Sequence, residues 1–332
     1  MKSFITLVFV CISSLLLAAE TVLSGAGSTF VEPIMAKWVV EYQKQHPDVR
    51  INDLPTGSGA GIAQAMRGMI DFGATDAPLS DDQLSKSATK LSHVPVIIGA
   101  DVPAYNLKSV NVDLRFTPQI LAEIFLEKIT KWNAAAIAAV NFGVSLPDGR
   151  IAVVHRSDGS GNVWTEYLSK ASPEWKQKVG QGTSVKWPTG IEGKGNEGVS
   201  AAIRQTDGSI GYLELAYAIR DKVANGSVQN VTGEFVKASV KSIAAAASSV
   251  KMLPNDLRAS ISNSSGAGSY PIASFSWVLV PTNLHGTAKG KALADFLTWI
   301  VGDGQRFAAD LFYAPLPEPV VQQARRTIDQ NR

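Results

Sequence analysis

Cysteine is almost absent from this sequence, and histidine is nearly as scarce. The only cysteine, Cys11, lies within an apolar N-terminal stretch, so the chain beyond that stretch has no thiol. Disulfides and cysteine-based metal sites are therefore excluded there, and the hydrophobic core has to supply the stability. The few histidines stand far apart, without the spacing of metal ligands: His46, His93, His155 and His285. We therefore expect a protein that holds no metal and no other cofactor.

Charge of either sign is also sparse. Charged residues make up 18% of the chain against 45% hydrophobic residues, without a low-complexity tract, which indicates a folded globular protein. The formal net charge is only +2, and no dense run of Lys and Arg is interleaved with aromatic residues, so nucleic acid is not an expected partner. The 332 residues suffice for one large domain or for two.

Common motifs of catalysis are missing as well. The sequence contains neither a Gly-x-Ser-x-Gly elbow nor a P-loop. Residues 193–198 match Gly-x-Gly-x-x-Gly, but they follow Trp-Pro-Thr-Gly instead of an apolar strand. We interpret them as a loop before a helix at 199–204, with dinucleotide binding as the alternative. These absences favour a binding protein over an enzyme.

The N-terminus has the layout of a secretory signal peptide. Lys2 supplies an early positive charge, an apolar run follows, and small residues precede Glu20. We predict a signal peptide over residues 1–19, cleaved after Ala18 or Ala19, and export to a bacterial periplasm. The alternative is an N-terminal membrane anchor, although the apolar run is near the lower length limit for a spanning helix.

Strand and helix patterns alternate along the rest of the chain, which predicts an α/β fold. Residues 49–54 and 151–155 are typical of strands, and helical periodicity is found over 60–70 and 118–125. In residues 94–105, Gly99 and Pro103 interrupt two short apolar runs.

Two places suit a crossing of the chain between lobes. One is the stretch 99–106, and the other is the Ser-rich region before residues 274–277. The segment from about residue 289, with apolar residues at helical spacing, is then expected to pack back onto the first lobe. This double crossing predicts two lobes with a cleft between them, where small ligands usually bind.

Short segments rich in Gly, Ser and Thr, each just before a helical pattern, are the most informative feature of the sequence. A helix N-terminus leaves backbone N–H groups unpaired and carries partial positive charge, and small residues let an anion approach the backbone closely. Several such segments in one chain predict a site for an oxyanion. They are residues 25–30, 56–61, 71–78 and 156–162.

Asp76 and Arg156 lie in two of these segments and are the most specific candidates. A guanidinium matches two oxygens of a tetrahedral anion, whereas a carboxylate repels the anion unless the anion carries a proton to donate. The pair therefore selects a protonated oxyanion such as hydrogen phosphate over sulfate, by roughly three powers of ten in affinity.

These residues also have structural interpretations. Asp76 can close a turn before Pro78, and Arg156 can form an ion pair with Asp158. In the functional interpretation, Asp158 instead holds the Arg156 guanidinium in place. Hydroxyls suited to binding anion oxygens are equally suited to capping helices. These belong to Ser28, Thr29, Ser58 and Ser160.

Several segments together resemble the periplasmic phosphate-binding protein of bacterial phosphate ABC importers, over nearly the whole chain after the N-terminal stretch. They are residues 25–30, 71–80, 129–132, 156–161, 185–188 and 193–196. The resemblance implies a type II periplasmic binding protein, in which each lobe is a mixed β-sheet flanked by helices. We place the first lobe at 20–103 and 275–332, and the second lobe at 104–274.

The resemblance also assigns roles in the cleft. Thr29 and the Phe30 backbone N–H would bind from the first loop, Ser58 from the second, and Asp76 would accept the proton of the phosphate. Arg156, Ser160 and Gly161 would bind from the other lobe. Position 162 carries Asn where the family usually has Thr, so Asn162 would bind through its N–H or its side-chain amide.

The expected function is capture of inorganic phosphate and its delivery to the transmembrane permease of an ABC importer, by a monomer. The alternatives are a receptor for another tetrahedral oxyanion such as sulfate, an exported phosphatase, and a surface protein that uses phosphate binding in signalling or adhesion.

Overall fold

The computed structural model describes residues 20–248, 250 and 252–332. The predicted signal peptide and Cys11 lie outside the described residues. The strands are β1 (Thr21–Gly27), β2 (Val49–Leu54), β3 (Phe72–Thr75), β4 (Leu91–Asn106), β5 (Arg115–Phe116), β6 (Ala152–Arg156), β7 (Ile191–Gly193), β8 (Ser209–Glu214), β9 (Ala224–Asn225), β10 (Ser227–Gln229), β11 (Phe235–Val236) and β12 (Ala273–Pro281). The helices are α1 (Glu32–Gln45), α2 (Ser58–Met66), α3 (Asp81–Ser85), α4 (Pro118–Phe125), α5 (Ala135–Val140), α6 (Asn162–Ala171), α7 (Pro173–Lys178), α8 (Gly195–Gln205), α9 (Leu215–Arg220), α10 (Val240–Ser248), α11 (Ala288–Ile300) and α12 (Glu318–Gln330).

Most strands join one mixed sheet in the order β2-β1-β3-β12-β4-β8-β6-β7, with β9 also paired to β4. β1 runs parallel to β2 and β3, and β6 runs parallel to β7 and β8. β12 and β8 pair antiparallel with β4 on its two sides. Helices flank this sheet, so the predicted α/β fold class is confirmed.

Strand β4 connects the two halves of the sheet. Its residues 91–100 pair with β12, and its residues 101–106 pair with β8. The expectation of two runs broken at Gly99 and Pro103 was therefore wrong. Pairing with different neighbours along its length holds the segment extended, which outweighs the local preference of these residues to interrupt a strand.

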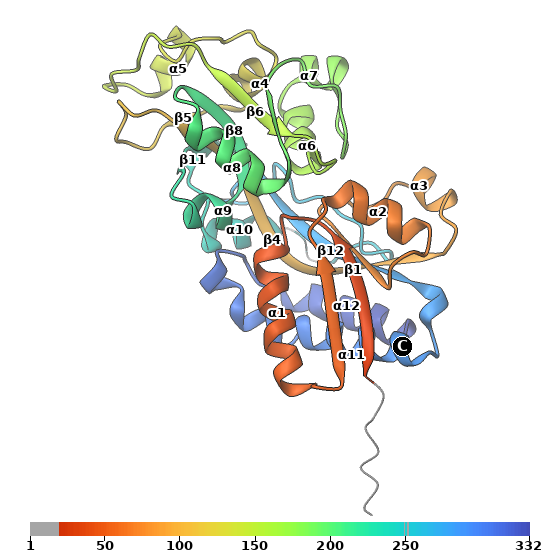
Figure 1. Ribbon diagram of the computed structural model, residues 1–332. Coiled ribbons are helices and arrows are strands. Elements are labelled where there is room, and N and C mark those ends of the chain that lie inside the picture. The colour runs from red at the N-terminus through yellow and green to blue at the C-terminus, as the bar shows by residue number, and fades with distance from the viewer. Residues whose placement is uncertain (1–19, 249, 251) are drawn as a thin grey trace, which may run out of the picture.

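Figure 1 shows two bodies on either side of this crossing. One contains β1, α1, α2, α11 and α12, and the other contains β6, β8, α4, α6, α7 and α8. The chain enters the second body along β4 and returns in β12, which gives the two-lobed architecture that the sequence predicts. The division at residues 103 and 274 stays a prediction.

Helix α11, in the C-terminal segment, returns to the first body as predicted. Its residues Leu293, Phe296, Leu297 and Ile300 are buried, and the helix packs against β1 and α1. Tyr42 of α1 meets Phe296 with ring centroids 4.9 Å apart.

Local signals fixed several boundaries. The predicted strand at 49–54 is confirmed as β2, and the Thr117 hydroxyl accepts a hydrogen bond from the Ile120 N–H at the start of α4. The helix expected over 60–70 instead ends at Met66, before Gly68 takes a left-handed φ of 66°. Residues 193–198 are not the expected loop, because β7 ends at Gly193 and α8 begins at Gly195.

The crossing strand depends on a close contact that only glycine permits. A Cβ added at Gly99 would lie 2.4 Å from the buried Phe30 ring, whereas a Cβ at Gly149 would meet nothing within 4 Å. We expect Gly99→Ala to lower the free energy of unfolding by about 1–3 kcal/mol, and the control Gly149→Ala to change it by less than about 0.5 kcal/mol. Urea unfolding measures both, and equal midpoints for the two variants would contradict the proposed packing.

Candidate functional site

The predicted segments meet where the two halves of the sheet face each other. The segments that follow β1 and β3 come from one lobe, and the segment that follows β6 comes from the other. Helices α2 and α6 begin at this place, and the residue before each helix, Gly57 or Gly161, has no side chain that could cap it. The Ser58 hydroxyl does not cap its own helix, because it donates to Asp76, whereas Ser160 Oγ accepts the first N–H of α2 from the other lobe. The partial positive charge of both helix ends lies at the meeting point.

Asp76 is buried at this meeting point, with 4% of its surface exposed. Its Oδ2 accepts hydrogen bonds from the hydroxyls of Ser28 and Ser58, the latter at 3.0 Å, and its Oδ1 accepts one from Ser276 at 2.7 Å. Burial raises the pKa of Asp76, while the three hydroxyls and the Arg156 charge act in the opposite direction. Asp76 is thus an internal acceptor, and closing a turn at the surface does not describe its role.

Arg156 comes from the other lobe and is buried as well. Its Nε and Nη2 donate to Oδ1 and Oδ2 of Asp158 at 2.8 and 2.6 Å, and Nη2 also donates to Thr29 Oγ1 at 2.7 Å. Burial disfavours the charged guanidinium, but the Asp158 carboxylate outweighs it and raises the pKa of Arg156. The predicted pairing with Asp158 is confirmed. It fixes one edge of the guanidinium, while Nη1 has no acceptor among the described residues.

Direct hydrogen bonds join the two lobes around these charges. The Ser58 N–H donates to Ser160 Oγ at 2.7 Å, and the Gly59 N–H donates to the Gly159 carbonyl at 3.0 Å. Small residues make this approach possible, because a Cβ at Gly57 would lie 2.5 Å from the Asp158 carbonyl oxygen. The structure is therefore a closed form, in which the site is enclosed by both lobes.

Three of the predicted site residues form no hydrogen bond with the side chain of Asp76 or Arg156. The Phe30 N–H donates to Ser28 Oγ at 2.9 Å, and the Gly161 N–H donates to the Thr183 carbonyl at 3.4 Å. Asn162 lines a neighbouring cavity of about 770 Å³ between the lobes. The structure brings the others together: Ser28, Thr29, Ser58, Asp76, Arg156, Asp158 and Ser160.

Two residues of the site were missed from the sequence. Ser276 lies on β12, about 200 positions from its partner Asp76, and its segment had been considered only as a place of crossing. Asn196 donates from Nδ2 to Thr29 Oγ1 at 3.2 Å and accepts the Glu214 N–H at 3.0 Å. The segment 193–196 had been noted for the resemblance, so that signal was available for Asn196.

The loop after Asp76 is held from two sides at Leu79. The Leu79 N–H donates to His93 Nε2 at 3.0 Å, and Arg258 Nη1 donates to the Leu79 carbonyl at 2.6 Å. Arg258 also binds Asp81 at 2.7 Å. Burial lowers the pKa of His93 to about 4, and the Arg258 charge adds to this effect. A neutral His93 is thus part of what positions the loop.

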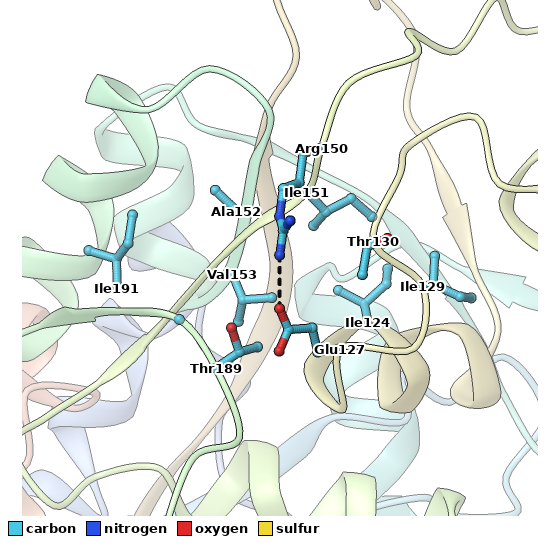
Figure 2. Close-up of a pocket in the computed structure, with 11 residues that line it drawn as sticks. Ile124, Glu127, Ile129, Thr130, Arg150, Ile151, Ala152, Val153, Thr189 and Ile191 are labelled. Atoms are coloured by element: carbon cyan, nitrogen blue, oxygen red, sulfur yellow. Dashed lines mark hydrogen bonds and ion pairs between the residues drawn. The ribbon is translucent and has the colours of Figure 1, made fainter.

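A further cavity of about 290 Å³ lies beside β6 and β7 and contains none of the predicted residues. Figure 2 shows Arg150 and Glu127 paired there, with 2.9 Å between Nη2 and Oε1. Both side chains are largely exposed, so this pair adds little stability.

The described residues form neither a cluster of metal ligands nor a membrane-spanning helix. No group of three or more His, Cys, Asp or Glu side chains there is placed to hold a metal ion. None of the helices described has the length and apolarity needed to cross a bilayer.

Known proteins resemble this chain in sequence and in fold. A family model described as a PBP superfamily domain matches residues 17–303. The phosphate-binding protein PstS of Xylella fastidiosa (strain Temecula1) is 45% identical over 305 residues, covering 91% of this chain and 83% of the relative. A putative phosphate ABC transporter substrate-binding protein with bound phosphate from Clostridium perfringens has a similar fold, with a TM-score of 0.66 and 21% identity over 90% of this chain and all of that one. A periplasmic phosphate-binding protein, PfluDING, solved with phosphate, has a TM-score of 0.72 at 21% identity, covering 92% and 93% of the two chains.

Protonation of His93 is expected to destabilise the fold in acid. The unfolded chain binds this proton near pH 6.5, whereas the folded protein binds it only near pH 4, so stability falls as the pH is lowered through this window. Between about pH 6.5 and 4.5 we expect the parent to lose about 2 kcal/mol more than His93→Gln, measured by urea unfolding. Parallel losses in the two proteins would show that His93 does not carry this effect.

Proposed function

The chain belongs to the PBP superfamily and, within it, to the phosphate-binding protein PstS family, and on that premise we propose that it captures inorganic hydrogen phosphate in the closed interlobe site. The observation that carries this proposal is the enclosure of one carboxyl, Asp76, together with one paired guanidinium, Arg156, between the N-termini of two helices. Such a site offers an acceptor for one proton and donors for the remaining oxygens.

The ligand's charge and its proton are bound by different groups. Hydrogen phosphate has one O–H, which donates to Asp76, and its other oxygens accept hydrogen bonds from Arg156 and from the hydroxyls of Thr29 and Ser160. The Ser58 hydroxyl donates to Asp76 in this structure, and it would turn to a ligand oxygen when the proton of the ligand takes its place at Asp76. The N–H groups at the start of α6, Asn162 among them, complete the set. The N–H groups of Phe30 and Gly161 donate to Ser28 Oγ and to the Thr183 carbonyl in this structure, and they would contribute by exchanging these acceptors for the ligand. Sulfate has no proton to donate near neutral pH, so it would place an unshared charge against Asp76.

Binding from both lobes links the ligand to closure. The bonds from Arg156 to Thr29 and from Ser58 to Ser160 exist only when the lobes meet, and a ligand that contacts both sides favours this state. The closed form then presents a different surface from the open form to a permease. No step of this mechanism breaks a covalent bond of the ligand.

The wider role follows from the same family membership. The Clostridium perfringens neighbour is described as part of a phosphate ABC transporter, and PfluDING is described as periplasmic. The present chain would be exported by the signal peptide predicted over 1–19, would act in the periplasm as a monomer, and would deliver phosphate to the permease of an ABC importer.

A chromogenic phosphate ester tests the phosphatase alternative. Turnover by the parent that is lost in Asp76→Ala would favour that alternative.

Discrimination between phosphate and sulfate tests the role of Asp76. A ligand that binds only the folded form raises the melting temperature. We expect phosphate to raise it by several degrees and sulfate at the same concentration to leave it almost unchanged, and we expect Asp76→Asn to reduce the difference by weakening phosphate and admitting sulfate. Equal shifts with the two anions in the parent protein would overturn the proposed role of the carboxyl.

The geometry of the Arg156 fork is tested by a change that keeps its charge. Lysine retains the positive charge beside Asp158 but cannot donate two parallel hydrogen bonds. We expect Arg156→Lys to weaken phosphate binding about 10- to 100-fold in titration calorimetry. The matched control is Arg150→Lys, at an exposed position just before β6, which should bind as the parent does. Undiminished affinity in Arg156→Lys would contradict the assignment.

A further inference from the structure

Two buried carboxyl groups that the site does not use face each other where β4 passes from one half of the sheet to the other. Asp101 of β4 is directly opposite Glu214 of β8 in the antiparallel register. Directly opposite residues project their side chains from the same face of the sheet, about 5 Å apart at Cβ. Asp101 is 2% exposed and Glu214 is fully buried, so both carboxyl groups are removed from bulk water.

Glu214 is a neutral acid in this setting. Its Oε2 accepts the Ala216 N–H at 2.8 Å, and its Oε1 has no partner among the described residues. The Tyr313 hydroxyl lies 2.6 Å from the Phe30 carbonyl and 3.2 Å from Glu214 Oε2. The Tyr313 hydroxyl has one proton, which it donates in the shorter bond to the Phe30 carbonyl. The longer contact, between Tyr313 and Glu214 Oε2, therefore requires a proton on Glu214. Burial accordingly raises the pKa of Glu214 well above its ordinary value.

Asp101 is the member of the pair that can change its charge. None of the described residues donates a hydrogen bond to its carboxyl group, although its backbone carbonyl accepts one from Tyr270 at 3.0 Å. Burial raises the pKa of Asp101 to about 7, the Arg156 charge lowers it, and the Asp76 charge raises it.

Titratable groups from several elements interact with Asp101. They are Glu214 and Tyr212 on β8, Arg156 at the end of β6, Asp76 after β3, and Tyr270 before β12. Tyr313, after the last 3₁₀ turn, and Tyr217 on α9 lie beyond Glu214. Arg156 is the one cation in this set, and it is already paired with Asp158. A dianion placed beside Asp76 and Arg156 would repel an ionised Asp101 and compete with it for the Arg156 charge.

We propose that binding of the phosphate dianion makes Asp101 take up one proton from the solvent, so that the loaded site holds Asp101 as a neutral acid. The proton comes from water or buffer and is distinct from the one that the ligand donates to Asp76. This inference rests on the proposed function, because the ligand's charge is its cause. Since the loaded protein binds more protons than the free one, affinity falls as the pH rises above about 7, by up to about tenfold per pH unit.

Titration calorimetry tests the uptake of the proton directly. Inorganic phosphate is added at about pH 8, where it is mostly a dianion and free Asp101 is mostly ionised, in two buffers with different ionisation enthalpies. The difference in heat gives the protons taken up per phosphate bound. We expect about 0.5–0.9 protons for the parent and about none for Asp101→Asn.

A second carboxyl, partly buried and outside the site, provides the matched control. Burial raises the pKa of Asp53 on β2 to about 6, its charged neighbour is Glu32, and its Oδ1 has no partner within the described part of the chain. Asp53→Asn should take up the same number of protons as the parent. A change in Asp53→Asn equal to that in Asp101→Asn would overturn the assignment to Asp101.

Other outcomes distinguish a failure of this inference from a failure of the proposed function. Phosphate binding with equal heats in both buffers would overturn the inference and leave the function standing, whereas the absence of binding in the parent would overturn the function itself. If Asp101→Asn does not fold, infrared difference spectra of the parent decide. A carboxylic acid band that appears with phosphate supports the inference, and its absence contradicts it.

Discussion

The burial of Asp76 is the constraint on which the rest of the site depends. A carboxyl removed from water needs donors, and here the donors are Ser28 after β1, Ser58 at the start of α2, and Ser276 on β12. These segments are far apart in the sequence, so satisfying one carboxyl fixes their positions relative to one another. The same hydroxyls and helix start also make the place suitable for an anion.

The second lobe adds the opposite charge under the same constraint. Arg156 is buried, and Asp158 holds it by two hydrogen bonds while it reaches across to Thr29. A guanidinium that is already paired and oriented loses little freedom when a ligand binds. Closure of the lobes and construction of the site are therefore one event, which is why a receptor of this kind can couple occupancy to shape.

Much of the fold could be predicted because its signals are local. The strand at 49–54, the helix at 118–125 and the apolar spacing along α11 depend on neighbours a few positions away, and each was confirmed. The exceptions have long-range causes. β4 continues through Gly99 and Pro103 because β12 and β8 pair with it, and no local pattern reports a partner more than a hundred residues distant.

For the site, the sequence by itself determined the chemistry: the Gly-rich segments before helices, Asp76 and Arg156, the pairing of Arg156 with Asp158, and the resemblance that joined them. These can be predicted because residue type and spacing set what a short segment can donate or accept. Only the tertiary structure decided that Ser276 and Asn196 join the site and that Asp101 on β4 faces Glu214 on the adjacent strand β8. Burial and proximity are properties of the packed chain, and they set the protonation state of a carboxyl as strongly as its identity does.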